Sequence, residues 1–224
     1  MGVSLEERPS VSAARRSASA RTRKLMIATA VELMQKGETP SVSAAAEAAG
    51  VSRATAYRYF PSQAALVEAV VNEALGPILS WESKSDDAGD RVEDLLRTSM
   101  PRIMEFESTF KAGLKLSLEQ WAQRRAGTLG TEPPFKRGHR VELLQRAIAP
   151  LRGKLTRAQF TRLAKALSFT YGLEVLIILK DLWGLRPAEI ENVAVWAGRA
   201  LVATAINEAG LPSDTNRTKE RRVR

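Results

Sequence analysis

A short basic and aromatic segment, RATAYRY at residues 53–59, carries the side chains with the clearest chemistry in this sequence. Guanidinium, hydroxyl and phenol groups can hydrogen-bond to phosphate oxygens and to the edges of bases. An α-helix of this length is narrow enough to enter the major groove of B-DNA. The segment therefore indicates contact with double-stranded DNA, whereas on an ordinary helical hairpin the same residues would only be solvated.

The residues before this segment form the elements that would position it. An alanine-rich stretch at 41–49 is followed by Gly50, Val51 and Ser52. Gly50 can adopt the left-handed conformation that ends a helix, Val51 can fill the corner, and Ser52 can cap the next helix. Small alanines let the two helices approach closely. Together these features predict a helix-turn-helix and favour DNA binding over a plain hairpin.

Apolar residues recur at helical spacing along the rest of the chain, and strand signals are nearly absent. Beyond the short helices of the first 75 residues, this spacing predicts helices over 90–106, 108–125, 138–150, 156–183 and 187–209. Pro101 lies inside one of them and should kink or split it. The sequence thus predicts an all-α fold.

Composition divides the chain into four parts. Residues 1–20, rich in Ser, Ala and Arg, predict a flexible basic arm, and residues 21–75 hold the predicted helix-turn-helix. The polar stretch at 80–90 marks a boundary, and residues 76–210 form a larger helical domain for ligand binding and dimerisation. A basic tail, residues 211–224, ends the sequence.

The charge balance favours a polyanionic partner. The chain has 34 Lys and Arg against 25 Asp and Glu, a formal net charge of +9. The basic residues of the arm and of the helix after it could lie on phosphates or enter the minor groove, or could simply be solvated. They are Arg15, Arg16, Arg21, Arg23 and Lys24.

Residue types needed for most enzymes and metal sites are scarce. There is no Cys, and His139 is the single histidine, so disulfides, thiolate metal sites and histidine-based triads have little to draw on. Glycine-rich phosphate-binding motifs are also missing. We therefore expect no catalytic residue, no metal and no cofactor. Without a signal peptide or an apolar run long enough to span a membrane, a cytoplasmic protein is expected.

The last two predicted helices indicate a homodimer. The final one carries small residues, Ala194, Gly198 and Ala205, that permit close helix approach. The preceding one is apolar all round and must be covered on every side, so two protomers would form a symmetric four-helix bundle. Its apolar residues are Leu173, Val175, Leu176, Ile177, Ile178, Leu179 and Leu182.

Residues 21–70 resemble the N-terminal domain of the TetR family of transcriptional regulators. The resemblance implies a three-helix DNA-binding head on each protomer and a larger C-terminal domain that dimerises and often holds a small effector. A repressor released by a small molecule is the leading interpretation; a regulator without an effector, or an all-helical enzyme or scaffold, are the alternatives. The matching residues are the amphipathic first helix, Ser41-Val42, Ala49-Gly50-Val51-Ser52, Thr55, Tyr57, Tyr59-Phe60, Pro61-Ser62 and Leu66.

The same resemblance implies DNA contacts at particular positions. Ser41 and Ser43 would meet phosphates, and Arg53 and Arg58 would read bases, because a guanidinium can pair with guanine at two points. Tyr57 would contact the DNA backbone or pack in the core. The remaining positions implied are Ala54, Thr55, Tyr59, Gln63, Arg21 and Arg23.

Two positions depart from the family pattern. Gln63 stands where a lysine is usual, which removes one charge for phosphate. Ala56 stands where a large apolar residue is usual, so a less tightly packed head is expected.

Aromatic residues of the C-terminal domain predict a ligand pocket, because pockets for small molecules are mostly apolar. They could equally fill the core. Glu174 would favour a cationic ligand, or would pair with an arginine across a helix contact. A small apolar or cationic effector is expected. The candidate pocket residues are Phe106, Phe110, Trp121, Phe169, Tyr171 and Glu174.

Overall fold

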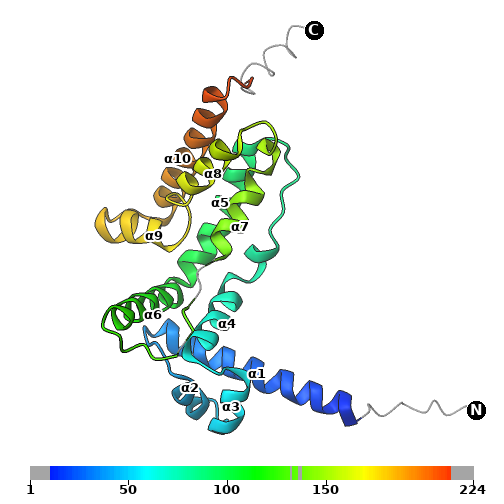
Figure 1. The fold of residues 1–224 in the computed structure, drawn as a ribbon, viewed down its shortest axis with the longest axis vertical. Helices are drawn as coiled ribbons and strands as arrows, with labels where there is room; N and C mark the ends of the chain where they lie inside the picture. Colours follow the sequence, from blue (N-terminus) through cyan, green and yellow to red (C-terminus); the bar gives the residue numbers. More distant parts are fainter. Residues whose placement is uncertain (1–10, 132, 136–137, 213–224) are drawn as a thin grey trace, which may run out of the picture. The chain divides into compact units, whose positions relative to one another are not determined.

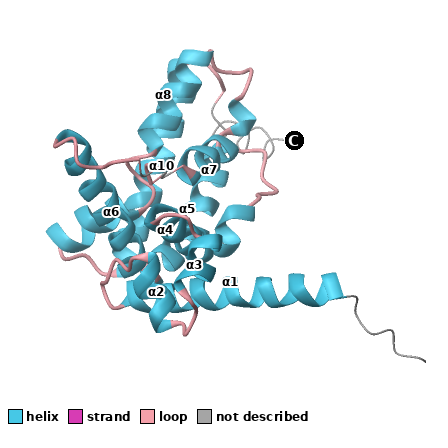
Figure 2. Ribbon diagram, turned by 60° about the horizontal axis from the view of Figure 1, so that its bottom comes forward, coloured by secondary structure: helices cyan, strands magenta, loops and turns pink. Residues whose placement is uncertain are grey.

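A computed structural model describes residues 11–131, 133–135 and 138–212, with the backbone alone at 11–16. The described chain consists of helices and the loops between them, without a strand, which confirms the all-α prediction (Figures 1 and 2). It forms two compact units: residues 11–73 with Lys111–Phe135, and residues 74–110 with 138–212. Residues 111–135 thus fold with the N-terminal head.

The first unit contains the predicted helix-turn-helix. Its helices are α1 (Val11–Gln35), α2 (Val42–Ala48), α3 (Arg53–Tyr59), α4 (Gln63–Leu75) as far as Glu73, and α6 (Glu107–Arg125) from Lys111 onward. Gly50 ends the α2 region with a φ of +64°, and the Ser52 side chain caps α3. The predicted turn is therefore confirmed at both residues.

Small side chains bring the helices of the head together. Ala30 of α1, Ala45 and Ala46 of α2, and Ala56 of α3 are fully buried. Ala56 therefore fills a core position in spite of its size, because the neighbouring helices approach closely enough to cover it. The other buried residues of this core are Met26, Ile27, Met34, Val42, Phe60, Leu66, Val67, Val70, Ala112 and Leu116.

Helix α1 begins at Val11, inside the segment predicted to be a flexible arm. Residues 11–35 contain neither Gly nor Pro, and Ala and Arg are among the strongest helix formers. Continuity with the buried part of α1 then extends the helix at little cost, since each added residue gains a hydrogen bond. The first ten residues of the predicted arm, and the predicted basic tail from residue 213, lie outside the described residues.

The second unit is built around the contact between α5 and α10. Its elements are η1 (Gly76–Ser80), α5 (Ala88–Glu105), α7 (His139–Ala147), η2 (Ala149–Leu151), α8 (Arg157–Leu167), α9 (Leu173–Leu176), the π-helical η3 (Ile177–Leu182) and α10 (Pro187–Glu208). Pro101 lies within α5 without ending it. Burial of the apolar face of α5 offsets the hydrogen bond that proline cannot donate.

The single helix predicted over 156–183 is wrong. The chain leaves α8 at Ser168 and starts α9 at Leu173, and Gly172 between them has a φ of +103°. A Cβ at Gly172 would lie 2.5 Å from the Arg140 guanidinium. Only glycine suits this position, and the helical periodicity on either side gave no sign of the break.

The small residues of α10 serve a contact inside the protomer. A Cβ on Gly198 would lie 2.9 Å from Val92 Cγ1 and 3.0 Å from Leu96 Cδ1, both on α5. Ala194 and Ala205 are buried on the same side of α10. The close helix approach predicted from these residues therefore exists, but it joins α10 to α5 rather than to a second protomer.

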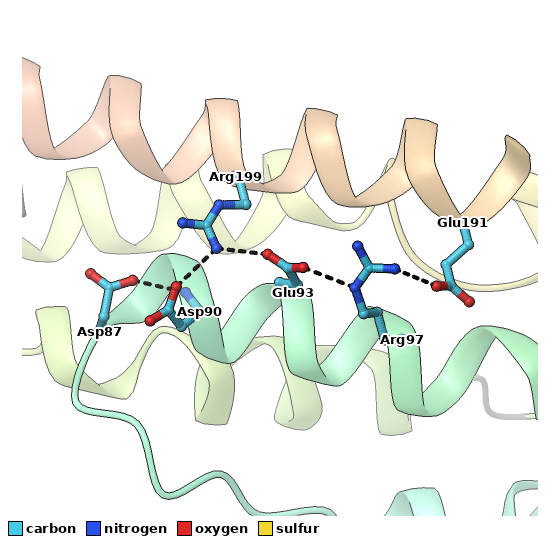
Figure 3. Close-up of polar contacts among 6 residues, drawn as sticks. All are labelled: Asp87, Asp90, Glu93, Arg97, Glu191 and Arg199. Carbon is cyan, nitrogen blue, oxygen red and sulfur yellow. Dashed lines mark hydrogen bonds and ion pairs between the residues drawn. The ribbon is translucent and has the colours of Figure 1, made fainter. Parts of the chain in front are cut away.

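Ion pairs run along the edge of the α5–α10 contact (Figure 3). Arg199 donates to Asp90 at 2.9 Å and to Glu93 at 2.7 Å. Arg97 donates to Glu93 at 2.8 Å and to Glu191 at 2.6 Å. The hydrogen bond from Arg97, followed by that from Arg199, holds the pKa of Glu93 below its ordinary value. These partly exposed pairs set the register of two helices whose contact is otherwise apolar.

Arginines also hold the polar segment that was predicted to be a domain boundary. Arg91 donates to the carbonyls of Ser83 and Ser85 at 2.8 and 3.1 Å. Arg146 donates to the carbonyl of Trp81 at 2.8 Å. The segment is thus tied to α5 and α7 of the second unit.

No described helix has the length and apolar character required to cross a bilayer.

The α5–α10 packing makes a prediction about Gly198. Replacing it with leucine would force a side chain into the space held by Val92 and Leu96, and should lower the free energy of unfolding by about 1–3 kcal/mol. Ala158→Leu, at an exposed position of α8, is the control and should change it by less than about 0.5 kcal/mol. Urea unfolding at one fixed protein concentration measures both. Equal losses would contradict the close packing.

Candidate nucleic-acid interface

Serine caps fix the two short helices of the interface. The Ser41 hydroxyl accepts a hydrogen bond from the Ala44 N–H at 3.1 Å, and Ser52 accepts one from the Thr55 N–H at 3.3 Å. Ser52 also donates to Thr55 Oγ1 at 3.0 Å. Each cap satisfies a backbone donor that a helix of seven residues would otherwise leave open.

Helix α3 has one exposed face and one buried face. Arg53, Ala54, Tyr57 and Arg58 are exposed, while Ala56 is buried in the core. Positions 53, 54, 57 and 58 follow the spacing of one helix face, so these four predicted site residues present a common surface. Thr55 and Tyr59 are half-buried at its edges.

Tyr57 links the exposed face of α3 to α2. Its phenol oxygen lies 3.3 Å from Ser43 Oγ, and 47% of the residue is exposed. Of its two interpretations, backbone contact or core packing, the exposure supports the first. The hydrogen bond joins two residues that sequence reasoning assigned to DNA contact separately.

Tyr59 turns towards α1. Its hydroxyl donates to Ser19 Oγ at 2.9 Å, and the Arg58 guanidinium lies 5.2 Å from the centre of its ring. The hydrogen bond with Ser19, and then that with Arg58, lowers the pKa of the Tyr59 phenol. Ser19 was missed by the sequence analysis, because nothing in the sequence marks one serine of a Ser/Ala-rich segment as the partner of a tyrosine 40 positions away.

Three residues predicted to contact DNA lie outside α2 and α3. The Gln63 amide donates to the carbonyls of Thr39 and Pro40 at 3.1 and 3.2 Å, so it ties the start of α4 to the turn before α2. Arg21 and Arg23 are exposed on α1. Arg23 lies 5.5 Å from the centre of the Phe60 ring, which brings it to the end of α3.

Positive charges of the head are left without carboxylate partners. Arg21, Arg23, Lys24, Arg53 and Arg58 form no ion pair within the described residues. In the second unit, four exposed arginines pair with acids, namely Arg97, Arg162, Arg186 and Arg199. Arg152 and Arg157 are exposed there without such a pair within the described residues. Unpaired cations on one surface repel each other and attract a polyanion.

The residues predicted to line a ligand pocket lie in different settings. Trp121 belongs to the first unit and is 60% exposed, whereas the other five belong to the second. Among those five, Phe169 is 83% exposed and Tyr171 is buried. Phe106 and Phe110 are half-buried. Glu174 pairs with Arg140, as the structural interpretation of this carboxylate predicted.

Comparison with known proteins agrees with this geometry. The family model described as bacterial regulatory proteins, tetR family, matches residues 26–70. A TetR transcriptional regulator from Rhodococcus sp. RHA1 has a similar crystal structure, with a TM-score of 0.55 and 19% sequence identity, covering 82% of this chain and 96% of that one. At this identity the likeness concerns the fold. A search of curated proteins finds no match.

The matched residues coincide with the buried part of α1, the capped helices α2 and α3, and the first part of α4. The unpaired cations and capped recognition helix lie within or beside this segment. At residues 26–70 the chain therefore carries a helix-turn-helix that matches the family model of the bacterial regulatory proteins of the tetR family.

Proposed function

We propose that this protein is a sequence-specific transcriptional repressor that binds operator DNA as a homodimer and releases it when a small molecule binds. The observation that carries the DNA-binding function is that Arg53 and Arg58, on the capped helix α3, are both exposed and form no ion pair within the described residues. Each guanidinium can make two hydrogen bonds to a guanine in the major groove. The hydroxyls of the exposed Ser41 and Tyr57 and of the half-buried Ser43 suit phosphate contacts beside it.

A second copy of this chain is proposed to cover an apolar surface on η3 and α10. Trp183 and Trp196 are each 73% exposed, and Ile178, Leu182 and Val193 are exposed with them. Trp196 lies two residues from Gly198, which places it on the side of α10 that faces away from α5. Exposed apolar side chains in such number are typical of an interface. A symmetric pair would carry two heads, which suits a palindromic site.

An effector site is proposed in the second unit, where buried hydroxyls lack partners. The hydroxyls of Ser99, Thr109 and Tyr171 are buried and form no hydrogen bond within the described residues. Burial has the largest influence on the Tyr171 phenol and raises its pKa. Because Arg140 already neutralises Glu174, a neutral, largely apolar molecule with a hydrogen-bonding group suits this region better than a cation.

Selection of duplexes from a random pool tests the DNA function. Arg53→Ala and Arg58→Ala should each weaken binding to the selected duplex by about 1–3 kcal/mol, with a much smaller loss on random duplex. Arg157→Ala, at an exposed arginine of α8, is the control and should bind as the wild type does. Fluorescence anisotropy measures the affinities. Failure to select any sequence would contradict the function, and equal losses on both duplexes would make the arginines phosphate contacts.

The dimer makes a prediction about Trp196. A glutamate there would place a charge in the centre of the proposed interface and should raise the dimer dissociation constant by about thirtyfold or more. Ala188→Glu, exposed on the same helix but outside the apolar stripe, should leave it unchanged. Sedimentation equilibrium gives both constants. A monomeric wild type at micromolar concentration would remove the proposal, and a Trp196→Glu dimer as stable as the wild type would place the interface elsewhere.

The effector site makes a prediction about Tyr171→Phe. Because the hydroxyl has no partner, its removal should leave the unfolding free energy unchanged or slightly higher. A loss of about 1 kcal/mol or more would show a partner in the protein and contradict the proposal. Neutral small molecules that raise the melting temperature and release DNA should lose at least about tenfold in affinity for this variant, whose DNA binding should be retained. Unchanged affinity would place the site elsewhere.

A further inference from the structure

The N-terminal part of α1 lies against the end of the recognition helix α3. Two contacts hold it there: the Tyr59 hydroxyl donates to Ser19 at 2.9 Å, and the Arg23 guanidinium lies 5.5 Å from the centre of the Phe60 ring. The partners are Tyr59, the last residue of α3, and Phe60, its C-cap, which come one and two residues after Arg58, a proposed base-reading residue. Figures 1 and 2 both show α1 continuing past this contact as a regular helix.

The charge of this part of α1 is of one sign. Residues 11–31 include five basic residues and no acidic one, and Glu32 is the first acidic residue within α1. Arg21 and Lys24 are exposed and three residues apart, so they lie on the same face. Neither pairs with a carboxylate. Like charges at this spacing destabilise an isolated helix, so the arrangement does not serve the stability of α1.

Helical structure decides where these cations can reach DNA. The minor groove of B-DNA is about 6 Å wide, whereas an α-helix with its side chains is about 10–12 Å across. The described part of α1 is therefore too wide to enter the minor groove, one of the two positions that the sequence left open for the basic arm. The phosphate backbone, which borders the groove that α3 would occupy, remains accessible to long exposed side chains.

We propose, on the basis of the regulator function above, that residues 17–24 of α1 form a second DNA-binding element that grips phosphates without reading sequence. Arg21 and Lys24 contact the backbone. Tyr59 acts as a positioning residue: its hydroxyl bonds to Ser19 and keeps α1 in line with α3, rather than binding phosphate itself. The basic helix thereby moves with the recognition helix as one rigid surface.

The test compares two variants of equal charge. Arg21→Gln/Lys24→Gln removes two cations from α1 of each protomer, and Arg157→Gln/Lys165→Gln removes two exposed cations from α8. Affinities for the selected duplex and for a random duplex of the same length are measured by anisotropy between about 50 and 200 mM salt. Circular dichroism checks that both variants keep the helical content of the wild type.

The α1 variant should lose affinity for both duplexes by the same factor, on the order of tenfold or more, and the slope of log affinity against log salt should fall by about 3–4 for a dimer. The α8 variant should keep the wild-type slope. An unchanged slope in the α1 variant, or an equal fall in both variants, overturns the proposal. If no selected duplex exists, the regulator function fails, while the slope on random duplex still decides the role of α1.

Tyr59→Phe and Ser19→Ala separate positioning from direct contact. If Tyr59 positions α1 through Ser19, each variant should lower the affinity for both duplexes to a similar extent, and the double variant should be no worse than either single one. Loss in Tyr59→Phe with none in Ser19→Ala would make the tyrosine a phosphate ligand and overturn its positioning role.

Discussion

The head depends on the burial of α3 against α1. A helix of seven residues is far too short to be stable alone, because it forms few internal hydrogen bonds for the residues it orders. Its stability has to come from the core, where Ala56 and Phe60 are buried in one cluster with Met26, Ala30 and Met34 of α1. The position of Arg53 and Arg58 is therefore set by the opposite, buried side of the same helix. A change in that core would move the proposed DNA surface without touching it.

Charge is used differently at the α5–α10 contact and on the surface of α1 and α3. In the second unit, Arg97 and Arg199 are shared between carboxylates of α5 and α10, and partly exposed pairs of this kind add modest stability while fixing register. In the head, Arg53, Arg58 and Lys24 remain unpaired at the surface. Unpaired cations give no stability to the free protein, so their value lies in binding. The place of these cations on α3 and on the neighbouring part of α1, more than the net charge of +9, points to the DNA-binding surface.

Packing inside the second unit determines what remains for assembly. Gly198 allows α10 to lie closely on α5, and the small residues of α10 are buried on this side of the helix. The large side chains, Trp196 and Trp183 among them, are left exposed. A symmetric interface built on tryptophan and leucine would bury more apolar area than one built on alanine and glycine, which makes the outward face of α10 suitable for a second protomer.

Local chemistry was sufficient to predict the elements of the site. Helical spacing, Gly50 and Ser52 define α2, the turn and α3 because capping and backbone conformation depend on neighbouring residues. Contacts between residues that are distant in the sequence cannot be predicted from such local signals. The backbone at the Gly172 break lies against the guanidinium of Arg140, the Tyr59 hydroxyl bonds to Ser19, and α10 packs inward against Val92 and Leu96. Periodicity shows that a helix has an apolar face, but which helix covers that face is decided by contacts between residues far apart in the chain, and only the tertiary structure contains them.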